Sequence, residues 1–179
     1  LIYFLCLVWL SHFIQVLVPE TGFDAIWYHL PVVDSILENG KIIFSPDLYQ
    51  SLNPLFSDLF FMIGYYFLGE TGAKFIAYLF GLLLAFATYK LAKLFLNTQL
   101  SLGVTILVST FQVIAWQSSS FYIDTAKAFW EVLAILFIIK SIDVEATKSY
   151  KIQLKIKSVL SFSASLATKL FSIFLLPVY

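Results

Sequence analysis

The chain has 179 residues, 60% of them hydrophobic and 12% charged, and its formal net charge is zero. A soluble domain usually carries about 25% charged residues, so this chain has too little polar surface to cover a water-soluble globule. Zero net charge gives no bulk attraction for nucleic acid, and the single cysteine, Cys6, excludes an internal disulfide. Long apolar runs recur along the chain, so we expect an all-α, polytopic membrane helix bundle with no nucleic-acid partner.

The first apolar run, 1–18, is long enough for a membrane span. It is followed by a more polar stretch, 19–52. Within this stretch, residues 24–39 have the pattern of an amphipathic helix, and Gly40 stands where a helix-ending glycine belongs. Pro31 falls inside the predicted helix and should kink or break it.

The next apolar stretch, 55–68, is ambiguous. Fourteen residues of helix cover about 21 Å, which is short of a hydrocarbon core of roughly 30 Å. The stretch also contains Asp58 and many aromatic residues, so we expect an interfacial helix, with a full span as the alternative. The remaining predicted spans are 72–96, 100–116, 124–140 and 159–178.

Lysines predict the orientation of these spans, because lysines at span ends favour the cytoplasmic side. Several lie between 140 and 157, and Lys90 and Lys93 lie near the end of the 72–96 span. Counting back from the 140–157 group puts all of these lysines inside and Gly72 outside. We therefore expect five spans and two juxtamembrane helices.

The location of Asp24 and Asp124 depends on this topology. If 55–68 lies in the interface, residues 19–71 form one outer loop and both carboxylates face outward. If 55–68 spans the membrane, the two carboxylates lie on opposite sides. Because the chain starts at Leu1 without a methionine, we expect 1–179 to be one transmembrane domain at the N-terminal end of a longer protein.

Five charged residues are candidates for chemistry, because an ionisable group at membrane depth is costly and usually has a partner or a role. Asp24 and Asp124 each fit either a helix N-cap or a functional carboxylate. Lys127 and Glu131 share a helical face with Asp124, either as a neutralised polar stripe or facing a ligand. Lys169 lies in the middle of a predicted span, so we expect an anionic partner for it, a buried carboxylate or a lipid phosphate, over snorkelling to the interface.

Signatures of soluble enzymes are missing from the sequence. It has no His/Cys pair with zinc spacing, no phosphate-binding glycine-rich loop and no serine-nucleophile motif. His29, five positions after Asp24, fits a hydrogen-bonded packing residue better than a metal ligand. No cofactor is indicated, and a requirement for a divalent metal ion stays open.

Four segments together resemble a known enzyme family: "FDAIWYHLP…ILENGKI", "NPLFSDLFFMIGYYFLGETGAKFIAYLFGLLLAFATYKLAKLF", "SSSFYIDTAKAFW" and "ASLATKLFSIFLLP". Their order and spacing are similar to those of the GT-C membrane glycosyltransferases, in particular the protein-mannosyltransferase and aminoarabinose-transferase-like branch. The resemblance covers nearly the whole chain through several short motifs, none of them specific alone. It implies a multi-pass protein of a bacterial or archaeal plasma membrane with its active site on the outer face.

The resemblance also implies an activity and residue roles. The enzyme would transfer a sugar, with inversion, from a polyprenyl-phosphate carrier to an acceptor glycan, lipid or protein. Asp24 matches the catalytic base, and Asp124 matches a second acidic residue of the same site. Lys169 matches a basic residue near the carrier phosphate.

Other residues complete the predicted site. Tyr28 and His29 would shape the sugar pocket. Family members often bind the phosphate with arginines, and this chain has none, so Lys41 and Lys74 are the further candidates besides Lys169.

Two other classes of function fit the same residues. A transporter or channel could use Asp24, Asp124, Glu131 and Lys169 as an ion path, although the chain shows no internal repeat. A non-catalytic scaffold or lipid-binding subunit would tolerate neutral replacements of its charged residues.

Overall fold

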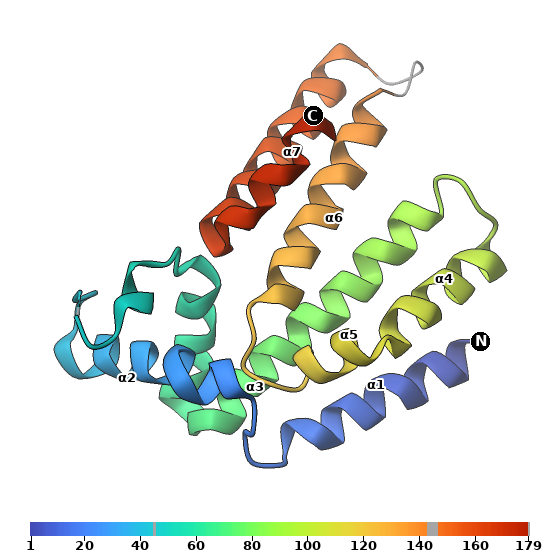
Figure 1. The fold of residues 1–179 in the computed structure, drawn as a ribbon. Coiled ribbons are helices and arrows are strands. Elements are labelled where there is room, and N and C mark those ends of the chain that lie inside the picture. Colours follow the sequence, from blue (N-terminus) through green and yellow to red (C-terminus); the bar gives the residue numbers. More distant parts are fainter. Residues whose placement is uncertain (45, 143–146, 179) are drawn as a thin grey trace.

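The computed structural model describes residues 1–44, 46–142 and 147–178, and these residues form helices without a strand (Figure 1). The expected all-α class is therefore confirmed for the described part of the chain. The α-helices are α1 (Ile2–Val16), α2 (Leu30–Asn39), α3 (Phe56–Ala92), α4 (Thr98–Thr110), α5 (Gln112–Gln117), α6 (Asp124–Ser141) and α7 (Lys148–Thr168). The shorter elements are a π-helical turn (Ala25–His29), a 3₁₀ turn (Tyr49–Leu52) and a C-terminal 3₁₀ helix (Leu170–Val178).

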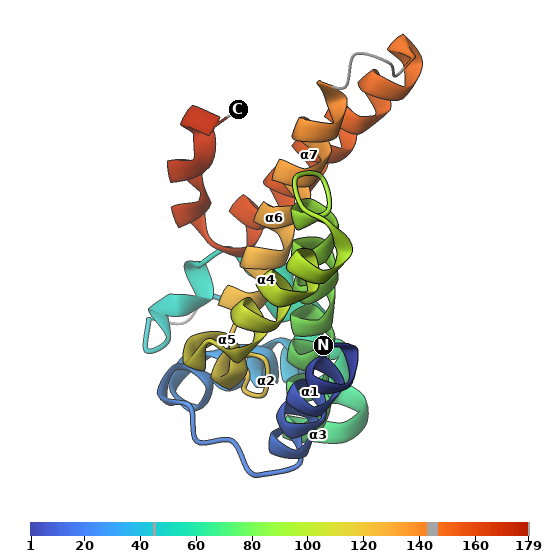
Figure 2. The ribbon, with the colours of Figure 1, turned by 90° about the vertical axis from the view of Figure 1, so that its right-hand side faces the viewer.

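Helix α3 is the centre of the bundle, and α1, α4 and α6 all pack against it. Helix α7 pairs with α6 on the far side (Figure 1). The end of α1, α2, the bend of α3, α5 and the start of α6 gather at the lower end of Figure 1, whereas the end of α3 and the Lys140 and Lys148 ends of α6 and α7 lie toward the top. Figure 2 shows that the C-terminal 3₁₀ helix turns away from α7 after its last residue.

Helix α3 is folded back on itself and consists of two helical arms joined by a sharp kink. The rings of Phe60 and Phe80 lie 5.8 Å apart, centroid to centroid. Twenty residues of straight helix would separate them by about 30 Å. The reversal occurs at Leu68 and Gly69, which have non-helical dihedrals. Gly69 has φ 59° and ψ −146°, a conformation open essentially to glycine alone.

The two arms of α3, 56–67 and 70–92, touch backbone to backbone at a pair of glycines. A Cβ atom built on Gly72 would lie 2.0 Å from the carbonyl oxygen of Gly64, and one on Gly64 would lie 2.3 Å from the carbonyl oxygen of Gly72. The predicted 55–68 helix therefore runs alongside the start of the predicted 72–96 span.

Among the described residues, α3 is the one helix long and apolar enough to cross a membrane by itself. Helices α1 and α4 are apolar but shorter, with 15 and 13 residues. A span of α-helix needs about 20 apolar residues, so neither matches the length expected for 1–18 or 100–116.

Two of the predicted spans, 100–116 and 159–178, are not single continuous helices in the structure. The 100–116 region divides into α4 and α5 at Phe111, whose ψ of 128° is not helical. Just before it, the Thr110 hydroxyl donates to the carbonyls of Ile106 and Leu107, an interaction that bends helices. The predicted 159–178 span is wrong because α7 begins at Lys148 and ends at Thr168, where Lys169 becomes extended.

Other boundaries agree with the sequence. Helix α6 covers the predicted 124–140, and α2 ends at Gly40 in the left-handed conformation with φ 65°. Pro31 sits in the first turn of α2, directly after the π-helical turn. The missing N–H of proline cannot continue the preceding hydrogen-bond ladder, which accounts for the change of helix type at this point.

A buried aromatic and aliphatic core lies between α3, α6 and the segment before α6. Phe61 and Phe121 are fully buried and make an edge-to-face contact, with ring centroids 4.8 Å apart. Phe80 and Ala126 belong to the same cluster. This core therefore fixes the first arm of α3, the segment before α6 and α6 itself relative to one another.

Candidate active site

Asp24 lies at the lower end of the bundle, one residue before the π-helical turn. Its backbone is helical, and its side chain makes no capping hydrogen bond. The half-buried carboxylate has no hydrogen bond or ion pair to any residue that the structure describes. The backbone N–H of Asp24 donates to the hydroxyl of Tyr122 over 3.2 Å, which ties the first polar segment to the residues before α6. The N-cap alternative does not account for this carboxylate.

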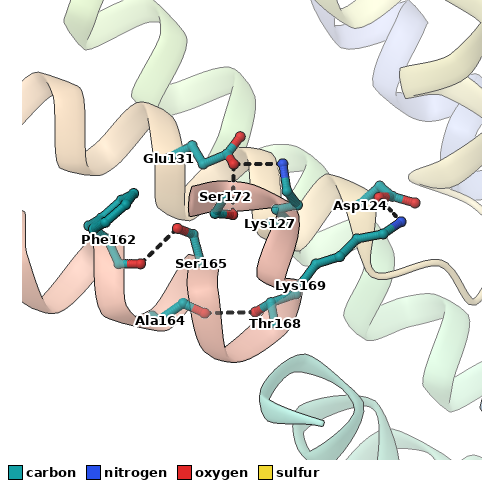
Figure 3. A network of polar contacts seen from close by, with 9 residues as sticks. All are labelled: Asp124, Lys127, Glu131, Phe162, Ala164, Ser165, Thr168, Lys169 and Ser172. Carbon is teal, nitrogen blue, oxygen red and sulfur yellow. Dashed lines mark hydrogen bonds and ion pairs between the residues drawn. The ribbon is translucent and has the colours of Figure 1, made fainter. Parts of the chain in front are cut away.

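Asp124 is the first residue of α6 and is likewise not a cap (Figure 3). Its Oδ1 accepts from Nζ of Lys169 over 2.7 Å, and its Oδ2 accepts from Nε2 of Gln117 over 3.3 Å. The side chains of Asp124 and Lys169 are 33% and 35% exposed, so the pair stays open to an incoming ligand. The helix dipole at the start of α6 favours the negative charge there.

The break at the end of α7 positions Lys169. Thr168 is buried, and its hydroxyl donates to the carbonyl of Ala164 and lies 2.8 Å from the hydroxyl of Ser57 on the first arm of α3. Lys169 then adopts an extended backbone, with φ −158° and ψ 122°. The expected anionic partner of Lys169 is thus the carboxylate of Asp124.

A second set of contacts joins α6 to the C-terminal 3₁₀ helix (Figure 3). Nζ of Lys127 lies 2.6 Å from Oε1 of Glu131, and the Ser172 hydroxyl donates to the same oxygen over 2.8 Å. Lys127 and Glu131 therefore neutralise each other, whereas Asp124 pairs across to another segment.

A cavity of about 380 Å³ opens beside the Asp124–Lys169 pair. It is lined by Tyr28, Ile123, residues 53–54 and residues 168–171. Asp24 is not among the lining residues; it precedes Tyr28, which lines the cavity together with Lys169, by four positions. The wall is mostly apolar, with Lys169 as its only cation among the described residues.

Two tyrosine hydroxyls lie in the field of these carboxylates. Burial raises the pKa of Tyr28, and the charges of Asp24, Asp58 and Asp124 raise it further. Burial also raises the pKa of Tyr122, with Asp24 and Asp124 among the charges that add to this effect. Both carboxylates, one hundred residues apart in sequence, act on the same two hydroxyls, which stay protonated and able to donate.

His29 pairs with Asp58 and not with Asp24. Its Nδ1 lies 2.6 Å from Oδ1 of Asp58, both side chains are almost fully buried, and the imidazole stacks on Phe121. Because the sequence separates them by 29 residues, only the folded-back arm of α3 brings Asp58 to this place. His29 is thus a hydrogen-bonded packing residue, as expected from the sequence, and its partner is Asp58.

Lys74 and Lys41 lie away from the cavity. Lys74 is buried, and its ammonium group donates to the backbone carbonyls of Gln15 and Val18 at the end of α1. It thus satisfies the unpaired carbonyls of that helix terminus. Lys41 is exposed just beyond Gly40.

Glu20 is a structural residue that the sequence reasoning missed. Its carboxylate accepts from the backbone N–H groups of Gly22 and Phe121 over 2.7 and 2.6 Å, and from the Ser120 hydroxyl over 2.6 Å. A Cβ on Gly22 would lie 2.5 Å from the ring of Tyr122, so glycine is needed for this close approach. The Thr-Gly pair after Glu20 was the available signal, since a short turn lets a carboxylate bind its own following N–H groups.

No group of three or more His, Cys, Asp or Glu side chains lies close enough to hold a metal ion in the part of the chain that the structure describes. The chain matches no protein-family model, and no curated protein or solved structure matches it. What the site offers chemically is therefore read from its own geometry: a free carboxylate, a partly exposed lysine, two protonated tyrosines, and a cavity lined by Tyr28 and Lys169.

Proposed function

We propose that this protein is a multi-pass membrane glycosyltransferase that moves a sugar from a polyprenyl-phosphate carrier to an acceptor glycan, lipid or protein on the outer face. The membrane setting is supported by a mean hydropathy of +0.89 and by large apolar side chains that face outward along α1 and α3. Leu7, Leu10 and Ile14 of α1 are all more than half exposed, and such apolar surface needs lipid around it. The lysine-rich end of α6 and start of α7 lie at the opposite end of the bundle from α2, an asymmetry that the positive-inside rule would read as cytoplasmic against outer side.

One observation carries the proposal: a partly exposed cation, Lys169, lines one cavity with Tyr28, and the charge of the unpaired Asp24 carboxylate acts on the Tyr28 hydroxyl. Glycosyl transfer from a lipid phosphate needs a base for the acceptor and a cation for the leaving phosphate. The cavity volume of about 380 Å³ is within the range of small-molecule sites.

The chemistry balances with these groups. The acceptor hydroxyl oxygen attacks the anomeric carbon while its proton passes to the Asp24 carboxylate. The bond between the anomeric carbon and the phosphate oxygen breaks on the opposite face, so the configuration inverts. The electron pair leaves with polyprenyl phosphate, whose charge Lys169 stabilises. Tyr28, held protonated, can donate a hydrogen bond to the sugar or the phosphate.

The test compares Asp24→Asn with Asp47→Asn in the full-length protein in lipid nanodiscs. Asp47 is an exposed carboxylate of the same polar segment and serves as the matched control. We expect Asp24→Asn to lower the turnover of radiolabelled polyprenyl-phosphate sugars by about 100-fold or more, while binding of the donor and the melting temperature stay unchanged. Asp47→Asn should turn over like the wild type.

Undiminished turnover in Asp24→Asn would remove Asp24 from the chemistry. Absence of turnover with every donor in the wild type, combined with ion-dependent currents or uptake that Asp24→Asn abolishes, would replace the proposal with the transport alternative.

A further inference from the structure

A small recess adjoins the Lys169 cavity and shares Tyr28, Asn53, Pro54 and Ile123 with it. Beyond these shared residues, the recess is lined by the polar Gln50, His29 and Asp58 and by the apolar Val32 and Leu55. Its volume of about 10 Å³ is close to the smallest space that holds one water molecule or one hydroxyl group. A recess the size of one hydroxyl, mostly apolar but with polar side chains in its lining, thus adjoins the large cavity.

Gln50 is the unusual member of this recess. Its side chain is 5% exposed, and its Nε2 is buried without a hydrogen-bond partner among the described residues. Buried amide groups are almost always hydrogen-bonded, because an unsatisfied donor costs free energy. An amide retained here without a protein partner indicates a partner that arrives with a ligand or with solvent.

The His29–Asp58 pair supplies the complementary group. Nδ1–H of His29 donates to Oδ1 of Asp58, and packing against Phe121 holds the ring. Asp58, which can accept a further hydrogen bond, and Gln50, whose N–H can donate one, therefore line the same recess. A hydroxyl group is the ligand that uses both, since it accepts one hydrogen bond and donates another.

We infer that this recess is a subsite for one sugar hydroxyl. Gln50 Nε2 donates a hydrogen bond to the hydroxyl oxygen, and the hydroxyl group donates a hydrogen bond to the carboxylate of Asp58. Within the proposed function, on which this assignment of the ligand rests, the group is a ring hydroxyl of the donor sugar. The subsite selects for it because a sugar without that hydroxyl leaves the buried Gln50 and Asp58 unpaired. Gln50 and Asp58 are thus specificity-determining residues, with His29 as the residue that positions Asp58.

The first experiment follows Gln50→Met in the full-length protein, with Gln153→Met, on the exposed face of α7, as the matched control. Methionine keeps the side-chain length and removes the unpaired amide, so the melting temperature should be unchanged or higher. Turnover is measured with polyprenyl-phosphate sugars that each lack one ring hydroxyl.

In the wild type and in Gln153→Met, we expect removal of one particular hydroxyl to lower kcat/KM by at least about tenfold. Gln50→Met should lower kcat/KM for the complete sugar by a similar factor and should lose the preference for that hydroxyl. A Gln50→Met variant that keeps the wild-type preference across the whole panel would overturn the subsite while leaving the glycosyltransferase proposal intact.

A second measurement stands apart from turnover. Saturation-transfer NMR on nanodiscs records the contact of free monosaccharides, including glucose, mannose, galactose and arabinose, with the protein. A signal present in the wild type and Gln153→Met but lost in Gln50→Met supports the subsite even if no donor is turned over. Equal signals in all three proteins, or no signal in any of them, would overturn it.

Discussion

Lys169 combines two roles at one atom, since its ammonium group holds Asp124 and also borders the cavity. An ion pair that is about one-third exposed on both sides contributes little to stability, about 0.2–1 kcal/mol. The contribution of Lys169 to the stability of the fold is therefore small compared with the stabilisation of a leaving phosphate that we expect from it. The two contributions can be separated by experiment.

Replacement of this lysine tests that separation. We expect Lys169→Met to lower kcat for sugar transfer by about 100-fold, because the leaving phosphate loses its cation, and to change the free energy of unfolding by less than about 1 kcal/mol. Lys155→Met, at an exposed position of α7, is the control and should be like the wild type in both measurements. A drop in stability without a drop in kcat would assign Lys169 to the fold.

The raised pKa of Tyr28 should make the stability of the fold depend on pH in the alkaline range. Burial and the charges of Asp24, Asp58 and Asp124 raise its pKa in the folded protein above the ordinary value of about 10. Above that pH the unfolded chain loses the proton that the folded protein keeps, so the unfolded state binds fewer protons. The free energy of unfolding should therefore be unaffected below about pH 10 and fall as the pH rises further.

Denaturant unfolding at a series of alkaline pH values measures this slope. Tyr28→Phe should flatten it, since phenylalanine has no proton to lose. Tyr150→Phe, an exposed tyrosine on α7, serves as the control. An identical slope in the wild type and Tyr28→Phe would contradict the assignment.

Among the secondary structures, the folded-back helix α3 determines most of the site. Its first arm carries Ser57, which contacts Thr168, and Asp58, which contacts His29. Both contacts require the arm to lie against the second arm, and this in turn requires Gly64 and Gly72 to touch.

A single methyl group should open this hairpin. We expect Gly72→Ala to lower the free energy of unfolding by about 1–3 kcal/mol or more, because its Cβ would overlap the carbonyl of Gly64. Gly103→Ala is the matched control: nothing lies within 4 Å of its Cβ in α4, so alanine should be neutral or stabilising by up to about 1 kcal/mol. Denaturant titration in mild detergent measures both, and equal stability of the two variants would show that the arms do not pack this way.

The sequence predicts those elements whose signals are local. Helix α6 and the glycine end of α2 follow from apolar periodicity and from Gly40, and both are found. The end of α7 at Lys169 has no glycine or proline to mark it; it accompanies contacts of Thr168 with Ser57, 111 residues away.

The same distinction holds for the site. Asp24, Asp124 and Lys169 stand out in the sequence because charges are rare in apolar surroundings. Asp58 is also a charge in an apolar stretch, but Gln50 carries no such signal, and the surroundings of both are formed by a chain reversal at Gly69 that periodicity does not indicate. Their partners could be found only from tertiary structure.

The whole bundle has two chemically different ends. Lysines lie at the end of α6 and the start of α7, whereas α2 and the start of α6, which carries Asp124, lie at the opposite end. Under the proposed function, the positive-inside rule would put these lysines in the cytoplasm and the cavity outside.

Labelling with a membrane-impermeant maleimide tests this orientation in intact cells. In a Cys6→Ser background, we expect Asp47→Cys to react before permeabilisation and Lys155→Cys to react only afterwards. Reaction of both positions from the same side would contradict the expected topology, and reversed labelling would put the cavity in the cytoplasm.

The Asp124–Lys169 pair has a consequence for ligand exchange under the proposed function. The carboxylate of Asp124 is already paired with the Lys169 ammonium group that a donor phosphate would need. Asp124 therefore competes with the phosphate for Lys169. Asp124→Asn should then tighten the binding of polyprenyl phosphate and slow its release, so that the product would inhibit the enzyme. Because that carboxylate is fixed to α6, it can recapture Lys169 as the product leaves, and the site resets without any change of fold.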